Sequence, residues 1–411
     1  MMNHLEQIFA RIDACTMDVI QLQTELTARV ALGPENGGTG EHEKIAYVKT
    51  LLEELHPTMI EEFHAIDSRV PAGYRPNLVA RWGEASEAPA VWILSHADIV
   101  PPGDLNLWHS DPYKVVIEED RVVGRGVEDN QHGIVSSYLA LKAVLDAGAP
   151  LARPVGLAIV ADEETGSEYG LVPLLAQRSD LFKKSDWIVV PDAGNETGTM
   201  IEVAEKSMLW LKLTVTGRQT HASTPHRGNN CLYGAARLIT AFDKIKSRFS
   251  KKDQLFSPPV STFECTKIEA NVPNVNTVPG RQVFYMDCRI LPVYEIETVI
   301  GAIGDVAAKV AQELDLKVDI QVVQRQDATE ATPADAPVVK ALERAVLRVT
   351  GREARPMGIG GGTFAAFFRR AGYPAAVWST APHTAHQPNE SCPIPDILSD
   401  AKVFACLFVE E

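Results

Sequence analysis

Three short apolar runs in this chain are each followed directly by residues whose side chains bind metal ions. Residues 90–94 run into His96 and Asp98, residues 155–160 into Asp162, Glu163 and Glu164, and residues 187–190 into Asp192. Continuous apolar runs of this length, separated by helix-like segments, are typical of strands buried on both faces of a mostly parallel sheet. Ligands of such sheets bind beyond the carboxyl ends of the strands. If the three strands are neighbours, one imidazole and several carboxylates converge, and their mutual repulsion predicts a cation between them.

The rest of the chain predicts two domains, since 411 residues exceed one ordinary hydrophobic core. Strand-like and helix-like segments alternate up to about Glu205, which is typical of a sheet covered on both faces. From Leu209 the pattern of apolar residues changes. Residues 211–216 alternate between apolar and polar, as in a strand of an antiparallel sheet that has one solvent-exposed face. A second strand candidate in this part is 282–289. We expect helices at 5–29, 43–55, 133–147, 171–177, 233–247, 293–313 and 338–349, and another buried strand at 375–378.

The predicted fold class is therefore α/β. A larger domain with a mostly parallel sheet comprises residues 1–205 and 326–411. A smaller α+β domain, with an antiparallel sheet and helices, is inserted at 206–325. A polar, proline-containing segment at 324–337 marks the return of the chain to the larger domain.

Composition excludes several classes of function. The net charge of −15 and the lack of a Lys/Arg-rich stretch predict no nucleic-acid partner, because phosphate binding requires a basic face. The six cysteines include no C-x-x-C pair, so a zinc knuckle and a dithiol redox motif are excluded. No apolar stretch is long enough to span a membrane, and residues 1–32 lack the basic and apolar regions of a signal peptide. We therefore expect a soluble, cytoplasmic protein without a membrane partner.

Seven segments, in this order, resemble the motif set of one enzyme family. They are 95–101, 124–130, 162–166, 191–194, 217–225, 360–363 and 386–390. The family is that of the dinuclear zinc amidohydrolases, which contains acetylornithine deacetylase, succinyl-diaminopimelate desuccinylase, glutamate carboxypeptidase, aminoacylase and several dipeptidases. The resemblance covers nearly the whole chain, and although a single H-x-D or D-E-E motif is weak, the ordered set is specific. It implies a zinc-peptidase catalytic domain with an inserted lid and dimerisation domain.

The resemblance implies that Asp129 bridges two zinc ions. His96 and Asp192 would complete one zinc site, and Glu164 and His386 the other. Zinc suits imidazole and carboxylate ligands, and two such ions about 3.5–4 Å apart would share one hydroxide. Cobalt or manganese can substitute, since these ligand types do not select strictly. Taken singly, each residue has a simpler alternative: a lone histidine often makes only a loop hydrogen bond, and a carboxylate after a Gly-Arg-Gly turn often caps a helix.

Two further acids are expected beside these ligands. The resemblance assigns Glu163 as the general base that takes a proton from the bridging water and delivers it to the leaving amine. An ordinary solvated acidic loop is the alternative for Glu163. Asp98 lies two residues after His96, where a carboxylate can hold the imidazole tautomer. His383 competes with His386 for the last ligand position, and only His386 lies in the His-x-Pro-Asn-Glu context of the family.

Donors for a substrate carboxylate and for a tetrahedral oxyanion are also needed. The candidates are Arg289, Gly361, Gly362, Thr363, Asn276 and His221. Arg289 can hold a carboxylate with its guanidinium fork, and the glycine-rich turn can present backbone N–H groups. Asn276 and His221 resemble lid residues that reach the scissile carbonyl, and in dimeric relatives the histidine comes from the partner's lid. A surface ion pair, a plain turn and a structural loop histidine are the alternatives for Arg289, the glycines and His221.

The leading hypothesis is a zinc-dependent hydrolase of an amide bond in a small substrate with a free carboxylate. An N-acyl amino acid, cleaved by a desuccinylase- or deacetylase-like activity, is the first choice, and a dipeptidase or carboxypeptidase acting on short peptides is the second. A non-catalytic metal-binding scaffold is the remote alternative. The resemblance also implies a homodimer formed through the inserted domain. Two departures from the family pattern, His132 where many members have lysine and Phe364 where several have aspartate, remove no ligand but bear on substrate specificity.

Overall fold

The computed structural model describes residues 4–84 and 88–410, which form two compact units. The first unit contains the described residues up to Val203, the segment Thr332–Pro356 and the described residues from Thr363 onward. The second unit contains Ala204–Ala331 and the short segment Met357–Gly362. Chain order does not reveal that residues 357–362 belong to the second unit, because the segments on both sides of them belong to the first.

An eight-stranded sheet with the strand order β1-β2-β6-β3-β7-β16-β8-β15 organises the first unit, and only the last residues of β8 and β15 are assigned to the second unit. The strands of this sheet are β1 (Met59–Ile66), β2 (Tyr74–Trp82), β3 (Val91–His96), β6 (Val155–Val160), β7 (Trp187–Val190), β8 (Met200–Glu205), β15 (Arg355–Ile359) and β16 (Ala375–Val377). The central strands β6, β3, β7 and β16 are parallel, whereas β1 and β2 are antiparallel to their neighbours and β8 is antiparallel to β16. The α/β class is confirmed, and the sheet as a whole is mixed with a parallel centre.

The three apolar runs that precede the candidate metal ligands are neighbouring strands. β3 lies between β6 and β7, with His96 opposite Val160 and Ile93 opposite Val189 in the parallel registers. Every residue of these three strands is buried, which explains why each is apolar along its whole length. Because parallel strands end at the same edge of a sheet, His96 and the residues that follow β6 and β7 meet there.

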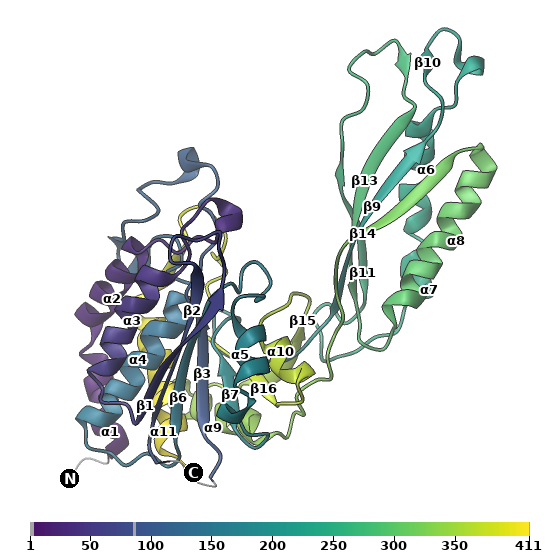
Figure 1. Cartoon of the computed structure of the whole chain (residues 1–411). Coiled ribbons are helices and arrows are strands. Elements are labelled where there is room, and N and C mark those ends of the chain that lie inside the picture. Colours follow the sequence, from purple (N-terminus) through teal and green to yellow (C-terminus); the bar gives the residue numbers. More distant parts are fainter. Residues whose placement is uncertain (1–3, 85–87, 411) are drawn as a thin grey trace. The chain divides into compact units, whose positions relative to one another are not determined.

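Helices cover both faces of this sheet (Figure 1). One face carries α1 (His4–Asp13), α2 (Thr16–Ala28), α3 (His42–Glu53), α4 (Gln131–Asp146), α9 (Pro337–Thr350) and α11 (Ile394–Val409), and the other carries α5 (Leu171–Gln177) and α10 (Ala365–Arg370). Under α5 and α10, the ring of Trp92 packs against that of Phe182, with centroids 4.9 Å apart. Trp92 also lies over Gly156, where an added Cβ would be 2.1 Å from the indole, so only glycine fits.

The single helix expected at 5–29 is two helices, separated by a tight turn at Ala14 and Cys15.

A small antiparallel sheet with the order β17-β5-β4 joins two loops that build the candidate site. Its strands are β4 (Val116–Glu118), β5 (Arg121–Val123) and β17 (Ser391–Pro393). Ser391 pairs with Val123, so Glu390 lies beside the turn that begins at Gly124. Short 3-10 helices occur at Pro34–Asn36, Leu105–Leu107, Ser179–Leu181 and Pro225–Arg227.

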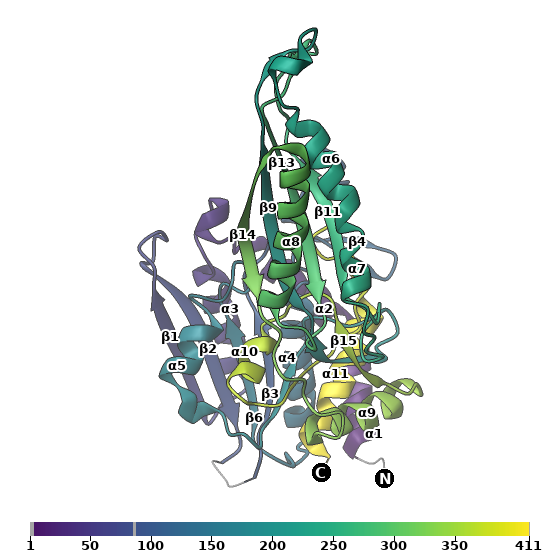
Figure 2. The ribbon, with the colours of Figure 1, turned by 90° about the vertical axis from the view of Figure 1, so that its right-hand side faces the viewer.

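The second unit consists of a four-stranded antiparallel sheet with helices packed on one of its faces (Figure 2). The sheet has the order β11-β13-β9-β14, with β9 (Ser207–Thr216), β11 (Thr262–Ile268), β13 (Arg281–Ile290) and β14 (Lys317–Gln326), and the helices are α6 (Cys231–Phe242), α7 (Ile245–Arg248) and α8 (Ile296–Leu314). Alternate residues of β9, among them Leu209, Leu211 and Leu213, are buried in one core with the helices. The period-two alternation thus marks a half-buried strand, as predicted. A short ribbon pairs β10 (Thr220–His221) with β12 (Thr277–Val278).

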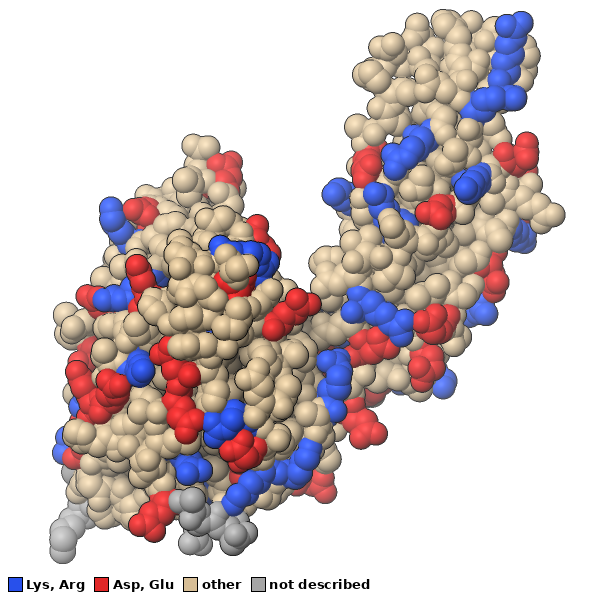
Figure 3. Space-filling model, in the orientation of Figure 1, with Lys and Arg blue, Asp and Glu red and all other residues tan. Residues whose placement is uncertain are grey.

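Among the helices of the described chain, none is both long and apolar enough to cross a membrane. The chain carries 54 acidic and 39 basic side chains. On the face that Figure 3 shows, the two kinds are interspersed over most of the surface. The net negative charge is therefore not gathered into one acidic patch on this face.

Candidate metal centre

Six side chains from separate segments of the first unit meet at the carboxyl end of the central strands. They are His96 at the end of β3, Asp129 in the turn before α4, Glu163 and Glu164 after β6, Asp192 after β7, and His386 in the loop between β16 and β17. Two groups of three among them, both containing His96, have ligand atoms within 4.8 Å of one another. One group adds Glu163 and Asp192, and the other adds Asp129 and Glu164.

Asp129 lies between the two histidines. Its Oδ1 atom is 2.9 Å from Nε2 of His96, and its Oδ2 atom is 3.1 Å from Nε2 of His386. Oδ1 of Asp192 is 3.2 Å from Nε2 of His96, and Oε2 of Glu164 is 3.3 Å from Nε2 of His386. One carboxylate thus separates two donor groups, one with His96 and Asp192 and the other with His386 and Glu164.

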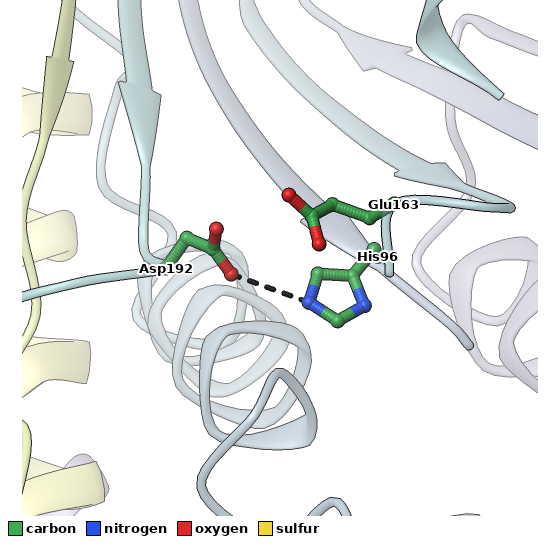
Figure 4. A group of neighbouring side chains, drawn as sticks. All are labelled: His96, Glu163 and Asp192. Atoms are coloured by element: carbon green, nitrogen blue, oxygen red, sulfur yellow. Dashed lines mark ion pairs between the residues drawn. The ribbon is translucent and has the colours of Figure 1, made fainter. Parts of the chain in front are cut away.

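Figure 4 shows the arrangement around His96. The imidazole ring and the carboxylates of Glu163 and Asp192 point toward one another, and a dashed line marks the contact between His96 and Asp192. The three residues follow or end neighbouring strands of the parallel centre, so the sheet itself sets their spacing. These distances allow Glu163 either of two roles, as a metal ligand or as a base beside the metal.

The donor set and its spacing fit divalent metal ions. Two ligand atoms that each lie about 2.0–2.1 Å from a tetrahedral ion are separated by about 3.3–3.4 Å. The contacts within the cluster, at 2.9–3.3 Å, are close to this value. Burial, followed by the charge of Asp129, raises the pKa of Glu164 to about 7, and burial, followed by the charge of Asp192, raises the pKa of Glu163 well above its usual range. Cations between these buried carboxylates would offset both effects.

Asp98 supports both His96 and the loop that carries the two glutamates. Its carboxylate accepts hydrogen bonds from the backbone N–H groups of Glu163, at 3.1 Å, and of Glu164, at 3.0 Å. Nδ1 of His96 lies 3.4 Å from Oδ1 of Asp98 and 3.1 Å from its backbone oxygen. When Nδ1 carries the proton and donates toward Asp98, Nε2 keeps the lone pair that a metal ion requires.

The sequence did not predict the role of Glu390, the last residue of the segment 386–390. Its fully buried carboxylate accepts hydrogen bonds from the backbone N–H groups of Gly126 at 3.1 Å, Glu128 at 2.9 Å and Asp129 at 3.0 Å, and from the guanidinium group of Arg125 at 2.6 Å. These bonds hold the turn that presents Asp129. They also tie this turn to the loop of His386. An arginine inside a glycine turn, together with an acid shortly after a candidate ligand, was the only signal for this contact.

A second buried network, from the first 80 residues of the chain, holds the turn after β6. Nε of Arg75 donates to Glu41 at 2.6 Å, and both side chains are fully buried. The backbone N–H of Asp162 donates to Glu41 at 3.3 Å, and Nη1 of Arg75 lies 3.5 Å from the Asp162 carboxylate. Asp162 has a φ of 62°, which is uncommon outside glycine. The network therefore stabilises a turn that directs Glu163 and Glu164 into the cluster.

The two histidines of the C-terminal loop have different surroundings. Nε2 of His386 contacts both Asp129 and Glu164, although the side chain is 54% exposed. His383 is exposed, and its backbone N–H donates to Glu128 at 2.9 Å. The contacts of His386 with two carboxylates support the choice of this residue as the ligand.

The candidates from the inserted domain fall in the second unit. His221 and Asn276 are close in space, because the backbone N–H of Ala222 donates to the carbonyl of Asn276 at 2.8 Å. Nδ1 of His221 is held by Ser223, whose backbone N–H donates to it at 3.1 Å. Nε2 of His221 therefore faces away from this local contact.

Arg289 and the glycine-rich turn are also brought together in the second unit. Nη1 of Arg289 donates to the carbonyl of Gly360 at 2.9 Å, which places the guanidinium group beside Gly361 and Gly362. Thr363 belongs to the first unit, where its hydroxyl accepts a hydrogen bond of 3.3 Å at the start of α10.

The chain is similar to proteins of known sequence and known structure over most of its length. It is 38% identical to an uncharacterized metallohydrolase of Methanococcus maripaludis over 94% of this chain and 97% of that protein. It is 32% identical to the succinyl-diaminopimelate desuccinylase of Gluconobacter oxydans over 71% of this chain and 73% of that protein. Human carnosine dipeptidase 1 has a similar fold, with a TM-score of 0.76 and 18% identity over 100% of this chain and 99% of that chain. Residues 92–410 match the family model of peptidase family M20/M25/M40, so the chain belongs to this family and is a metallohydrolase acting on amide bonds.

Proposed function

We propose that this metallohydrolase holds two zinc ions and cleaves the amide bond of an N-acyl amino acid, with desuccinylase- or deacetylase-like activity. The position of Asp129 is the observation that carries the proposal. Its two oxygens face different histidines, His96 and His386, as expected of a carboxylate shared by two ions. Asp192 would complete the set around His96, and Glu164 the set around His386.

The bound ions would polarise the scissile carbonyl and lower the pKa of the attacking water. Glu163 takes the proton of that water and delivers it to the nitrogen of the leaving amine. Asp98 keeps Glu163 in place through the backbone N–H of that residue, and it keeps the ring of His96 oriented. The hydrogen bonds from this loop to Asp98 thus fix the position of the proton carrier, Glu163, relative to the proposed ligand Glu164.

The substrate carboxylate is assigned to Arg289 and to the turn formed by Gly361, Gly362 and Thr363. The hydrogen bond from Arg289 to the carbonyl of Gly360 supports this assignment, because it brings the cation to the turn whose backbone N–H groups are the other proposed donors. His221 and Asn276 are assigned to the scissile carbonyl oxygen, and a homodimer formed through the second unit would supply His221 to the partner.

The acyl group is assigned by similarity. The Gluconobacter oxydans relative, at 32% identity, is named for removing a succinyl group, whereas the likeness to carnosine dipeptidase 1, at 18% identity, is one of fold. We therefore place N-acyl amino acids before dipeptides. All six cysteines are free thiols, which supports assignment of the protein to the reducing cytoplasm.

The variant Glu163→Gln tests the proposal. It is expected to retain its metal content and to lose amide hydrolysis by about 100- to 10,000-fold, because the proton carrier is removed and every proposed ligand remains. Metal analysis and turnover of N-succinyl and N-acetyl amino acids, with dipeptides as the comparison, measure both properties. Glu168→Gln, an exposed acid of the same loop, is the matched control. Near-normal turnover by folded, metal-loaded Glu163→Gln protein would refute the assignment, and loss of metal would make Glu163 a ligand.

A further inference from the structure

The open face of the four-stranded sheet carries an aromatic side chain directly beside the candidate carboxylate-binding arginine. Leu209 and Leu211 of β9 point into the core, so Trp210 between them points to the opposite face, where it is 37% exposed. Asp287 of β13 lies directly across from Trp210 in the antiparallel register. Arg289 follows two residues later on the same strand and therefore on the same face.

Asp287 connects these two side chains. The indole Nε1 of Trp210 donates to Oδ2 of Asp287 at 2.7 Å. Nε of Arg289 donates to Oδ1 at 2.8 Å, and Nη2 donates to Oδ2 at 3.0 Å. The carboxylate of Asp287 thus fixes the plane of the guanidinium group and the orientation of the indole ring at the same time.

Arg289 keeps donors for a ligand after these contacts. A guanidinium group has five N–H donors. Asp287 takes two of them and the carbonyl of Gly360 takes a third, so two donors of Arg289 have no partner among the contacts of the described chain. Two N–H groups on one planar cation match the two oxygens of a carboxylate.

A hollow of about 410 Å³ lies on the same sheet, and its wall residue Asp287 is two residues from Arg289 on β13. Its walls include Trp210, Tyr285, Asp287 and Val323. Residues two apart on a strand are separated by about 7 Å. A carboxylate on Arg289 and the side chain of the same small molecule in this hollow are therefore within reach of each other.

The rings of Trp210 and Tyr285 give the hollow apolar wall surface, beside the polar side chains of Thr266 and Lys267. The Nε1–H of Trp210 is bound to Asp287, and the hydroxyl of Tyr285 donates to Glu269 at 2.6 Å. With their polar groups engaged, both residues offer ring surface to a ligand. Lys267 has its ammonium group 4.9 Å from the centroid of the Tyr285 ring, which disfavours a second cation in this position.

We propose that this hollow is a side-chain subsite, which takes the apolar or aromatic side chain of the residue whose carboxylate Arg289 binds. The inference rests on the proposed function, because that function places the substrate carboxylate on Arg289. Asp287 acts as a positioning residue for both parts of the subsite, and Trp210 provides its selectivity.

Binding of matched ligands to the metal-loaded Glu163→Gln protein tests the subsite without turnover. The ligands are the N-acetyl and N-succinyl derivatives of phenylalanine and glycine, titrated by calorimetry. The phenylalanine derivatives are expected to bind about tenfold more tightly than the glycine derivatives, and the added change Trp210→Ala is expected to remove most of this preference while glycine binding stays within about twofold. Trp210→Phe, which keeps an aromatic ring, is expected to retain the preference.

Further variants separate positioning from packing. Asp287→Asn is expected to weaken the binding of both the phenylalanine and the glycine derivatives at least threefold. This effect is expected to vanish in a protein that already carries Arg289→Ala. Asp319→Asn, an exposed acid of β14 in the same sheet, is the matched control and is expected to change nothing. Equal affinity for the two amino acids, or an equal loss for both in Trp210→Ala, would overturn the subsite while leaving the proposed function in place. If neither ligand binds, the carboxylate role of Arg289 is refuted together with the subsite.

Discussion

Glutamine in place of Glu390 removes a buried charge and nearly preserves the volume of the side chain. In the structure this carboxylate is the ion-pair partner of Arg125, whose side chain is 1% exposed. It also accepts the backbone N–H of Asp129 at 3.0 Å. The substitution therefore acts on the protein's stability and on the position of a proposed metal ligand together.

The size of the effect follows from the buried pair. Removal of one partner of such a pair costs about 3–5 kcal/mol, because the other charge stays buried without compensation. We expect about 3 kcal/mol for Glu390→Gln, since the amide oxygen still accepts one hydrogen bond. The ring of Trp108, whose centroid is 5.3 Å from the guanidinium carbon, also remains beside Arg125. Partners that orient a metal ligand typically change metal affinity by about 10- to 100-fold, and we expect a loss of zinc affinity in this range.

Two measurements check this prediction. Burial raises the pKa of Glu390 to about 7, so urea unfolding of the chelator-treated protein is measured above this pH, where the carboxylate is ionised, and gives the change in stability. Competition with a chromophoric chelator gives the zinc affinity. Glu118→Gln, an exposed acid of β4, is the control and is expected to shift the free energy of unfolding by less than about 0.5 kcal/mol. If Glu390→Gln matches this control in both measurements, the hydrogen bonds of Glu390 do not determine where Asp129 lies.

His386→Ala is expected to lower metal content and hydrolysis together, whereas His383→Ala keeps both; metal analysis that shows the reverse would exchange the two ligand assignments. If the inserted domains of a dimer exchange His221, mixing inactive His221→Ala chains with inactive Glu163→Gln chains is expected to restore activity. No recovery in confirmed mixed dimers would mean that His221 acts in the site of its own chain. Burial, followed by the charge of Asp400, raises the pKa of Asp396 from 3.8 to about 6. The stability that Asp396 contributes is therefore fully present below pH 3.8 and is lost as the pH rises through 6. Between pH 4 and pH 7, the free energy of unfolding of Asp396→Asn is expected to rise relative to that of the unchanged protein by up to about 3 kcal/mol. Urea unfolding of both chelator-treated proteins measures this difference, and a difference that does not depend on pH would contradict the raised pKa.

The central strands were predictable from the sequence because their burial leaves a continuous apolar signature. β3, β6 and β7 are buried at every residue, and β9 alternates between core and solvent. The edge strand β14 was not predicted, since most of its residues are exposed and its composition is polar. Helix α11 was also not predicted, because residues around its whole circumference are buried and the amphipathic period is weak.

The ligand types of the site were likewise visible in the sequence, but the groups that hold them were not. Glu41 and Arg75 precede the first motif, and they act on the turn of Asp162 through contacts between distant parts of the chain. A buried ion pair has no local pattern of its own, since neither residue differs in type from the many exposed acids and arginines around it. Only the folded chain shows which few of these charges are enclosed.

The sequence by itself indicated a metal site, because imidazole and carboxylate groups follow three apolar strands, and the order of its motifs indicated the amidohydrolase chemistry. The tertiary structure decided the pairing of those groups. Asp129 lies between His96 and His386 because the strand order β6-β3-β7 and the contact of Glu390 with the turn after Gly124 bring three remote segments to one edge. Such pairings depend on which strands are neighbours and on which buried charges find partners, and these are properties of the whole fold that no local stretch of sequence carries.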